Sequence, residues 1–190
     1  GQNNAVKVAL SSPDFVTGIQ GNAGSGKTTL LSEISDGVKA AGKPILTIAP
    51  SSQAVEVLRK EGFDAHTVAA FIVNTKLHQE IRNGALLYDE AGLSGVKSKT
   101  KVFSIAKDQK AQVILSGDTK QNNSPGESGD AFRILQQDAK IRTAFVKENM
   151  RQKPAAYRKA VDQIANGSIL QGYQTLDKMK AIQEIPDLDK

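Results

Sequence analysis

Short apolar runs alternate with amphipathic stretches along this chain of 190 residues. Five runs have the length and composition of β-strands, the last of them only weakly: 15–20, 44–49, 86–89, 112–116 and 143–147. Four stretches have the apolar spacing or the flanking residues of helices: 27–41, 52–60, 131–137 and 155–165. Strands that alternate with helices need right-handed crossovers, which produce a parallel sheet covered on both faces. The pattern therefore predicts an α/β fold of three layers, with a parallel sheet of four or five strands flanked by helices.

Glycines and polar residues mark the ends of these elements. Three glycines each follow a predicted helix, which is a common stop signal: Gly42, Gly62 and Gly167. The longest polar stretch, residues 119–130, is typical of an exposed loop. The sequence has no internal repeat and no linker long enough to divide it. We expect one domain over residues 1–180, with residues 181–190 as a tail or the start of a linker.

The composition is that of a globular protein, because 39% of the residues are apolar and 24% are charged. There is no cysteine, which excludes disulfide bonds and thiolate zinc sites, and two histidines leave little scope for a histidine-rich metal site. No stretch approaches the roughly 20 apolar residues that span a bilayer, and the start, GQNNAVKVAL, lacks the pattern of a signal peptide. We therefore expect a cytoplasmic protein without a membrane partner.

The net charge of +5 is distributed unevenly along the chain. Residues 97–110 carry five lysines against Asp108, and residues 139–159 carry seven basic residues against Glu148. Two basic blocks on an otherwise acidic chain indicate a polyanionic partner, although two solvated helix faces would have the same composition. With six Phe, three Tyr and no Trp, an aromatic stacking platform is disfavoured as the main means of binding.

A glycine-rich motif follows the first predicted strand and opens the first predicted helix. It fits the pattern GxxxxGK[ST] at every fixed position, with the residues Gly21, Asn22, Ala23, Gly24, Ser25, Gly26, Lys27 and Thr28. The glycines allow backbone N–H groups to surround an anion, and the amino end of the helix adds partial positive charge. We assign Lys27 to the β- and γ-phosphates of a nucleotide and the Thr28 hydroxyl to Mg²⁺, with Thr29 beside them. A glycine-rich turn that binds no ligand is the simpler alternative.

Two other apolar strands end in polar residues at the same expected edge of the sheet. Asp89 and Glu90 end the third strand, where one carboxylate can hold Mg²⁺ and the next can accept a proton from an attacking water. We assign Asp89 to the metal and Glu90 to the water. Gln121 follows the fourth strand and could hydrogen-bond the γ-phosphate or that water. Taken alone, each segment is also consistent with an ordinary structural turn.

In their order, these motifs resemble the first motor domain of RecD-like superfamily-one DNA helicases, most closely the modules of conjugative relaxase–helicases of the TraI type. Gln2 stands where that family has an adenine-reading glutamine. Six segments resemble motifs of that family: residues 21–28 (motif I), 49–54 (motif Ia), 65–67 (the adjoining strand-contacting segment), 89–92 (motif II), 117–121 (motif III) and 150–152 (motif IV). The likeness extends over nearly the whole chain.

The resemblance implies a RecA-like P-loop NTPase fold, in which the strand at 112–116 lies between those at 15–20 and 86–89. It implies ATP with Mg²⁺ as cofactor and single-stranded DNA as partner, beside a relaxase domain and a second motor domain. The catalytic residues that it implies are Lys27, Asp89, Glu90, Gln121 and Arg151, and the family places this arginine near the γ-phosphate. The DNA-binding residues that it implies are Ser51, Ser52, His66, Thr67 and Lys120.

The sequence departs from the family in two respects. Motif Ia reads Ala-Pro-Ser-Ser-Gln, where the family often has threonine followed by a small and a basic residue. The 190 residues also contain no counterpart of motifs V and VI or of the second motor domain's arginine finger, and no relaxase histidine cluster or tyrosine nucleophile. Because an arginine finger contributes about 10³–10⁵ in rate, we expect this chain alone to be nearly inert as an ATPase.

Two functions remain open at this point. The chain is either the nucleotide-binding half of an ATP-dependent DNA helicase or a vestigial RecD-like copy that binds single-stranded DNA without ATP hydrolysis. The set Lys27, Asp89 and Glu90 favours the first. A third hypothesis is an unrelated phosphate-loop kinase or GTPase, which the segments at 117–121 and 150–152 disfavour.

Overall fold

The computed structural model of the chain describes residues 2–21, 26–117, 131–146, 155–179 and 181–182. Its internal contacts divide the chain into two compact units, residues 1–148 and residues 149–190. The first unit is built on a β-sheet, and the described part of the second unit is a pair of helices.

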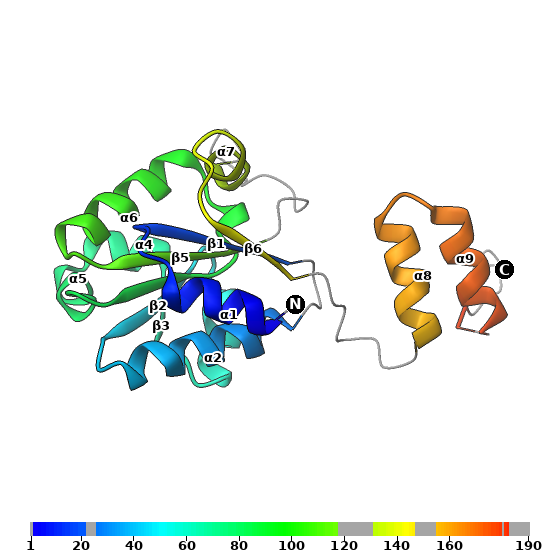
Figure 1. The fold of residues 1–190 in the computed structure, drawn as a ribbon, viewed down its shortest axis with the longest axis horizontal. Helices are drawn as coiled ribbons and strands as arrows, with labels where there is room; N and C mark the ends of the chain where they lie inside the picture. Colours follow the sequence, from blue (N-terminus) through cyan, green and yellow to red (C-terminus); the bar gives the residue numbers. More distant parts are fainter. Residues whose placement is uncertain (1, 22–25, 118–130, 147–154, 180, 183–190) are drawn as a thin grey trace, which may run out of the picture. The chain divides into compact units, whose positions relative to one another are not determined.

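The sheet of the first unit has six parallel strands in the order β3-β2-β4-β5-β1-β6 (Figure 1). The strands are β1 Val16–Gly21, β2 Ile45–Ala49, β3 Ala65–Thr67, β4 Ala85–Tyr88, β5 Gln112–Gly117 and β6 Thr143–Val146. As expected, β5 lies between β1 and β4. The sheet has one strand more than predicted, because β3 has only three residues and cannot show a visible alternation. Only its pairing with β2, in which Thr67 lies opposite Ala49, identifies it.

Helices cover both faces of this sheet, which confirms the three-layer α/β architecture (Figure 1). One face carries α1 Gln2–Ser11, α2 Lys27–Ala40 and α3 Ser52–Lys60. The other face carries α4 Val68–Val73, α5 Thr75–Glu80, α6 Val96–Asp108 and α7 Ala131–Gln137. The patterns predict α2, α3 and α7 to within one residue but miss α1, α4, α5 and α6. Of these, α4 and α5 are shorter than the window in which a helical period is visible. Among the described helices, none has both the length and the apolar character that crossing a membrane requires.

Alternation along the two central strands fills two halves of the core. Leu87 of β4 and Ile114 of β5 belong to the cluster beneath α1, α2 and α3, whereas Leu86 and Val113 belong to the opposite cluster. Successive side chains point to opposite faces because the period of a strand is two residues. Both strands are therefore apolar on both faces, as expected for strands that helices cover on either side.

The basic block at residues 97–110 is only partly a solvated face. Lys97, Lys101 and Lys107 of α6 are exposed. Lys99 is only 2% exposed, and its ammonium donates a hydrogen bond to the backbone carbonyl of Ser94. The interpretation of this block as a solvated face is therefore wrong for Lys99, which is buried. A lysine at an inward position also explains why α6 is hard to recognise from its apolar spacing.

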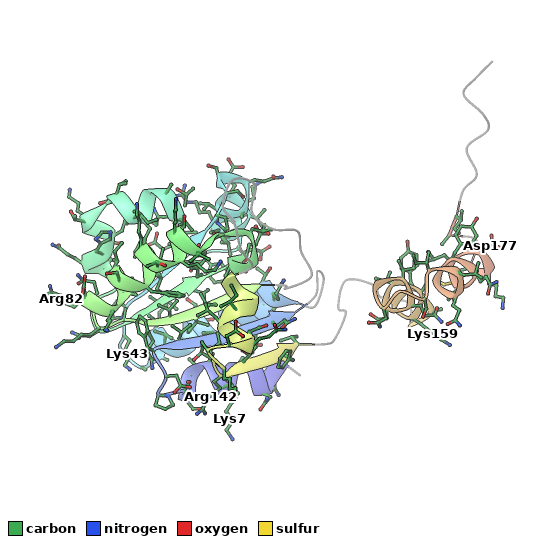
Figure 2. The ribbon with its side chains drawn as sticks, turned by 90° about the horizontal axis from the view of Figure 1, so that it is seen from above. Lys7, Lys43, Arg82, Arg142, Lys159 and Asp177 are labelled. Carbon is green, nitrogen blue, oxygen red and sulfur yellow. The ribbon has the colours of Figure 1, made fainter. Side chains whose placement is uncertain are left out.

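The second unit contains a helical hairpin of α8 Ala155–Ala165 and α9 Ile169–Lys178. The helices pack closely at Gly172, where an added Cβ would lie 2.8 Å from the carbonyl oxygen of Ala160. The Thr175 hydroxyl donates a hydrogen bond of 3.0 Å to the side-chain oxygen of Gln163. Figure 2 labels Lys159 on α8 and Asp177 on α9. The hairpin thus packs on itself, and the single domain over residues 1–180 stays a prediction.

Truncation of either central core residue should strongly destabilise the first unit. Leu87 and Ile114 are 0% and 3% exposed, so Leu87→Ala or Ile114→Ala leaves a cavity and lowers the free energy of unfolding by about 2–5 kcal/mol. Val73→Ala is the matched control, because Val73 is 79% exposed and its truncation should cost less than about 0.5 kcal/mol. Urea unfolding measures all three. A loss below about 1 kcal/mol at a core position would contradict its placement on a central strand.

Candidate functional site

The predicted site segments follow the carboxyl ends of parallel strands. In a parallel sheet these ends share one edge, and ligands bind outside that edge. The phosphate loop follows β1, motif Ia follows β2, the Asp89–Glu90 pair follows β4, and motif III begins at the end of β5. The opposite edge, where β2 and β4 begin, carries Lys43 and Arg82 (Figure 2). Motifs that are distant in sequence therefore share one side of the first unit.

Gly26 shapes the end of the phosphate loop. It caps α2 with φ 76° and ψ 28°, a left-handed conformation that glycine adopts at little cost. Because Gly26 has no side chain, it leaves the first N–H groups of α2 without a side-chain cap. These N–H groups carry the partial positive charge of the helix dipole. The amino end of α2 therefore suits an anion such as phosphate.

The Lys27 ammonium lies at the carboxyl end of β1. Its Nζ donates a hydrogen bond of 2.9 Å to the carbonyl oxygen of Gly21, which joins the first residue of the motif to its lysine. A phosphate oxygen is a stronger acceptor for an ammonium than a neutral carbonyl, because both partners are then charged. The carbonyl of Gly21 thus holds Lys27 at a position from which an anion can attract it. Thr28 is half-buried and Thr29 is exposed on the same turn of α2.

Asp89 and Glu90 connect β4 to the short 3₁₀ helix η1 Ala91–Leu93. The Asp89 N–H donates a hydrogen bond of 2.9 Å to the carbonyl of Ile48, so the parallel ladder with β2 continues through Asp89. Glu90 then turns the chain with φ 49°, a left-handed conformation that costs a residue with a Cβ about 1–2 kcal/mol. Strain of this kind persists only where surrounding contacts fix it, and it is frequent at functional sites.

The charges of these residues interact across the sheet. Burial and the neighbouring Asp89 carboxylate raise the pKa of Glu90, whereas the Lys27 ammonium acts in the opposite direction. Lys27 follows β1 and Glu90 follows β4, and β5 lies between these strands. The fold therefore brings the lysine of the phosphate loop and the carboxylates of motif II into one electrostatic environment.

A buried hydroxyl that the sequence patterns do not single out lies at the end of β5. Ser116 is 0% exposed, and among the described residues its Oγ has no hydrogen-bond partner. It directly precedes Gly117, where motif III begins. The sequence signal is slight: a hydroxyl residue that ends an otherwise apolar run on a central strand.

Two hydroxyls of the predicted DNA-binding set cap helices at the ends of β2 and β3. Ser51 Oγ accepts a hydrogen bond of 3.1 Å from the N–H of Ala54 in α3, and Thr67 Oγ1 accepts one of 3.1 Å from the N–H of Ala70 in α4. Each cap uses an acceptor lone pair and leaves the hydroxyl proton available to another acceptor. Both side chains can therefore hold a helix end and donate to a phosphate.

The other described members of that set lie beside these caps. Ser52 is exposed at the first position of α3. His66, on β3, is half-buried, and its Nε2 lies 3.1 Å from a carboxylate oxygen of Asp64. Of the remaining predicted site residues, Gln2 begins α1. Those outside the described residues are Asn22, Ala23, Gly24, Ser25, Lys120, Gln121 and Arg151.

The chain is similar to bacterial conjugation proteins, as its motifs indicated. It is 29% identical over 193 residues to the multifunctional conjugation protein TraI of Escherichia coli strain K12, and this match covers 96% of the chain and 11% of TraI. It is 28% identical over 163 residues to the conjugal transfer protein TraA of Rhizobium radiobacter, and this match covers 84% of the chain and 14% of TraA. These matches confirm the resemblance to TraI-type proteins. The chain spans only a small part of the length of either relative.

A solved structure and a family profile agree with the fold. The SWI2/SNF2 ATPase core of Sulfolobus solfataricus, solved in complex with dsDNA, matches with a TM-score of 0.53 and 13% identity over 94% of this chain and 56% of that one. At this identity the match shows a common fold alone. The profile of the AAA domain family matches residues 1–187, which include almost the whole chain. The chain therefore belongs to the AAA domain family, and TraI and TraA are among its relatives.

Proposed function

We propose that this chain is the nucleotide-binding half of an ATP-dependent DNA motor that acts in conjugative transfer and holds single-stranded DNA along the same sheet edge. The observation that carries the proposal is that Lys27 after β1 and Glu90 after β4 lie at one edge of the sheet, where the Lys27 ammonium acts on the Glu90 carboxyl. A phosphate-loop lysine and strand-end carboxylates are the groups that recur in phosphate-loop ATPases. The conjugation proteins among the relatives support conjugative transfer as the process in which such a motor would act.

The residues present fit a nucleotide that carries Mg²⁺. Glu90 has a raised pKa partly because Asp89 crowds negative charge at the end of β4, and a cation beside Asp89 would relieve that repulsion. The Thr28 hydroxyl and the Asp89 carboxylate are hard oxygen ligands of the kind that Mg²⁺ prefers. A bound Mg²⁺ would neutralise part of the negative charge on the β- and γ-phosphates.

Each reacting group of the chain has a separate role in this proposal. Lys27 exchanges the Gly21 carbonyl for the β- and γ-phosphates, and Glu90 accepts a proton from the attacking water. The resemblance implies that Gln121 would orient that water and that Arg151 would contact the γ-phosphate, and both residues lie outside the described part of the chain. Because an arginine finger contributes about 10³–10⁵ in rate, fast hydrolysis would need a second motor domain as a partner, beside the relaxase domain of a longer protein.

Single-stranded DNA would cross the ends of β2 and β3. The hydroxyls of Ser51, Ser52 and Thr67 would donate to its phosphates, with His66 and Lys120 as further contacts. Contacts to phosphates position a strand without reading its bases, so binding should be indifferent to sequence. It should also be weak, in the micromolar to millimolar range, because one unit neutralises few phosphates.

Nucleotide binding should be visible at the phosphate loop. In the parent chain, millimolar MgADP should shift the backbone amide resonances of residues 24–28, because their N–H groups would receive the phosphates. Lys27→Ala should abolish these shifts without unfolding the chain. Lys39→Ala, in the last turn of the same helix, is the matched control and should keep them. Resonances that do not move in the parent would favour the vestigial copy that binds DNA without ATP.

The crowded carboxylates predict pH-dependent stability of the nucleotide-free chain. Because the pKa of Glu90 is raised on folding, the folded chain binds this proton more tightly than the unfolded chain does. Stability should therefore fall as pH rises from the ordinary glutamate pKa through the raised one, where Glu90 becomes ionised. Glu90→Gln removes this loss, so its melting temperature should exceed the parent's at about pH 7 and match it near about pH 4.

Thermal unfolding in EDTA measures this difference. Glu61→Gln, at an exposed position beyond α3, is the control and should follow the parent at both pH values. If Glu90→Gln were less stable than the parent at about pH 7, the placement of Glu90 in a buried, negatively charged environment would be wrong.

Charge reversal should separate the proposed DNA track from ordinary surface charge. His66→Glu and Lys120→Glu should each weaken binding of a fluorescent single-stranded oligonucleotide, and Lys120→Glu should lower the salt slope by about 1. Lys43→Glu is the control, because Lys43 precedes β2 at the opposite edge (Figure 2). If both variants bind as well as the parent, the track is not the binding surface, and the basic block at residues 139–159 becomes the better candidate.

A further inference from the structure

We propose that Ser116 is a positioning residue of the Mg²⁺–nucleotide site, whose hydroxyl donates a hydrogen bond to the Asp89 carboxylate when the nucleotide is bound. The inference rests on the proposed function, since it concerns the same site. It adds a residue that neither the phosphate loop nor the motif II carboxylates include.

The first reason is the burial of the hydroxyl. Ser116 is 0% exposed, and its Oγ has no hydrogen-bond partner among the described residues. Val113, Ile114 and Leu115, which precede it on β5, are all apolar and buried. A buried hydroxyl without a partner costs stability that an alanine would not cost, so such groups call for an explanation. A ligand-dependent partner is such an explanation.

The second reason is the register between β4 and β5. Tyr88, the last residue of β4, lies opposite Leu115, and the next residues along the chain are Asp89 and Ser116; continued by one step, the register brings these two side by side. The hydrogen bond from the Asp89 N–H to Ile48 keeps Asp89 in the ladder at this point. Neighbouring strands are about 4.8 Å apart, which a short hydroxyl and a carboxylate can bridge when they share a face.

The third reason is that the two-residue period of a strand, continued past Leu87 and Ile114, assigns both side chains to the face on which α2 packs. Leu87 and Ile114 contribute to the core cluster that includes α2 residues, and a strand returns to the same face after two residues. Two residues after Leu87 is Asp89, and two after Ile114 is Ser116. On its other side Ser116 lies opposite Ile19 of β1, two residues before Gly21, whose carbonyl holds Lys27. Ser116 therefore lies between the two halves of the nucleotide site.

This placement gives Ser116 a defined physical task. Carboxylates that ligate a metal are usually hydrogen-bonded themselves, and such outer partners fix the orientation of the ligand. Removal of an outer partner typically costs about 10–100-fold in metal affinity. The Ser116 hydroxyl can supply this bond from a rigid central strand, with little entropy left to lose because its side chain is already buried.

The test compares ADP binding by the 190-residue chain in Mg²⁺ and in EDTA, measured by calorimetry. The readout is the factor by which Mg²⁺ strengthens ADP binding. Ser116→Ala should lower this factor about 10-fold and leave ADP binding in EDTA unchanged. Ser116→Thr, which keeps the hydroxyl, should restore most of it. Ser35→Ala, which removes a buried hydroxyl in the middle of α2, is the matched control and should behave as the parent.

Thermal unfolding of the nucleotide-free chain completes the test. Ser116→Ala should melt at the same temperature as the parent or higher, because it removes an unpartnered polar group. An unchanged Mg²⁺ factor in Ser116→Ala would overturn the role of Ser116 and leave the proposed function intact. So would an equal loss of ADP affinity in Mg²⁺ and EDTA, since Asp89 would then not be the partner. A parent chain that binds no ADP would overturn the proposed function and this inference together.

Discussion

Strand β5 pairs in parallel with both β1 and β4, and this pairing organises the sheet and the candidate site. It places three strand ends side by side at one edge of the sheet, so that Lys27 after β1 and Glu90 after β4 interact electrostatically. The same pairing requires central strands that are apolar on both faces, because helices cover either side. The side chain of Gln112 adds a further link, since it donates a hydrogen bond of 3.0 Å to the carbonyl of Ser12, just before β1.

Polar groups at this edge are held in arrangements that are unfavourable without a ligand. Glu90 adopts a left-handed backbone conformation, burial and Asp89 raise its pKa, and Ser116 keeps a buried hydroxyl without a partner among the described residues. The apolar core on both faces of the sheet provides the stability that tolerates these costs. In the proposed function, a site held in this way would need little rearrangement to receive an anion and a cation, which is the advantage of preorganisation.

The sequence predicts the elements that show a clear apolar run or helical spacing, whereas α1 and α6 show neither clearly enough to be predicted. Strands β1, β2, β4 and β5 and helices α2 and α3 follow from apolar runs, spacing and stop glycines, and Gly42 and Gly62 do have positive φ. The patterns cannot reveal β3, whose three residues are defined by pairing with β2. They also cannot reveal that Lys99 points inward, because burial of a lysine depends on the carbonyl of Ser94 that receives its ammonium.

The candidate site divides in a similar way between what sequence patterns reveal and what they cannot. Lys27, Asp89 and Glu90 are recognisable because their chemistry requires particular residue types after particular strands. Ser116 is not, since a single serine on a strand acquires meaning only when the register places it opposite Ile19 and directly after Leu115, the partner of Tyr88. The hydrogen bond of Lys27 to Gly21 and the raised pKa of Glu90 are likewise consequences of packing that no spacing encodes.

The position of a bound nucleotide would show whether the edge formed by β1, β5 and β4 is the nucleotide site. A crystal structure of the chain grown with ADP and Mg²⁺ should show the phosphates at the amino end of α2. In that structure the Lys27 ammonium should have left the Gly21 carbonyl for a phosphate oxygen, with the metal between Thr28 and Asp89. A nucleotide bound away from this edge, or a Lys27 that still donates to Gly21 beside bound phosphates, would rule out this edge as the site at which Lys27 binds the phosphates.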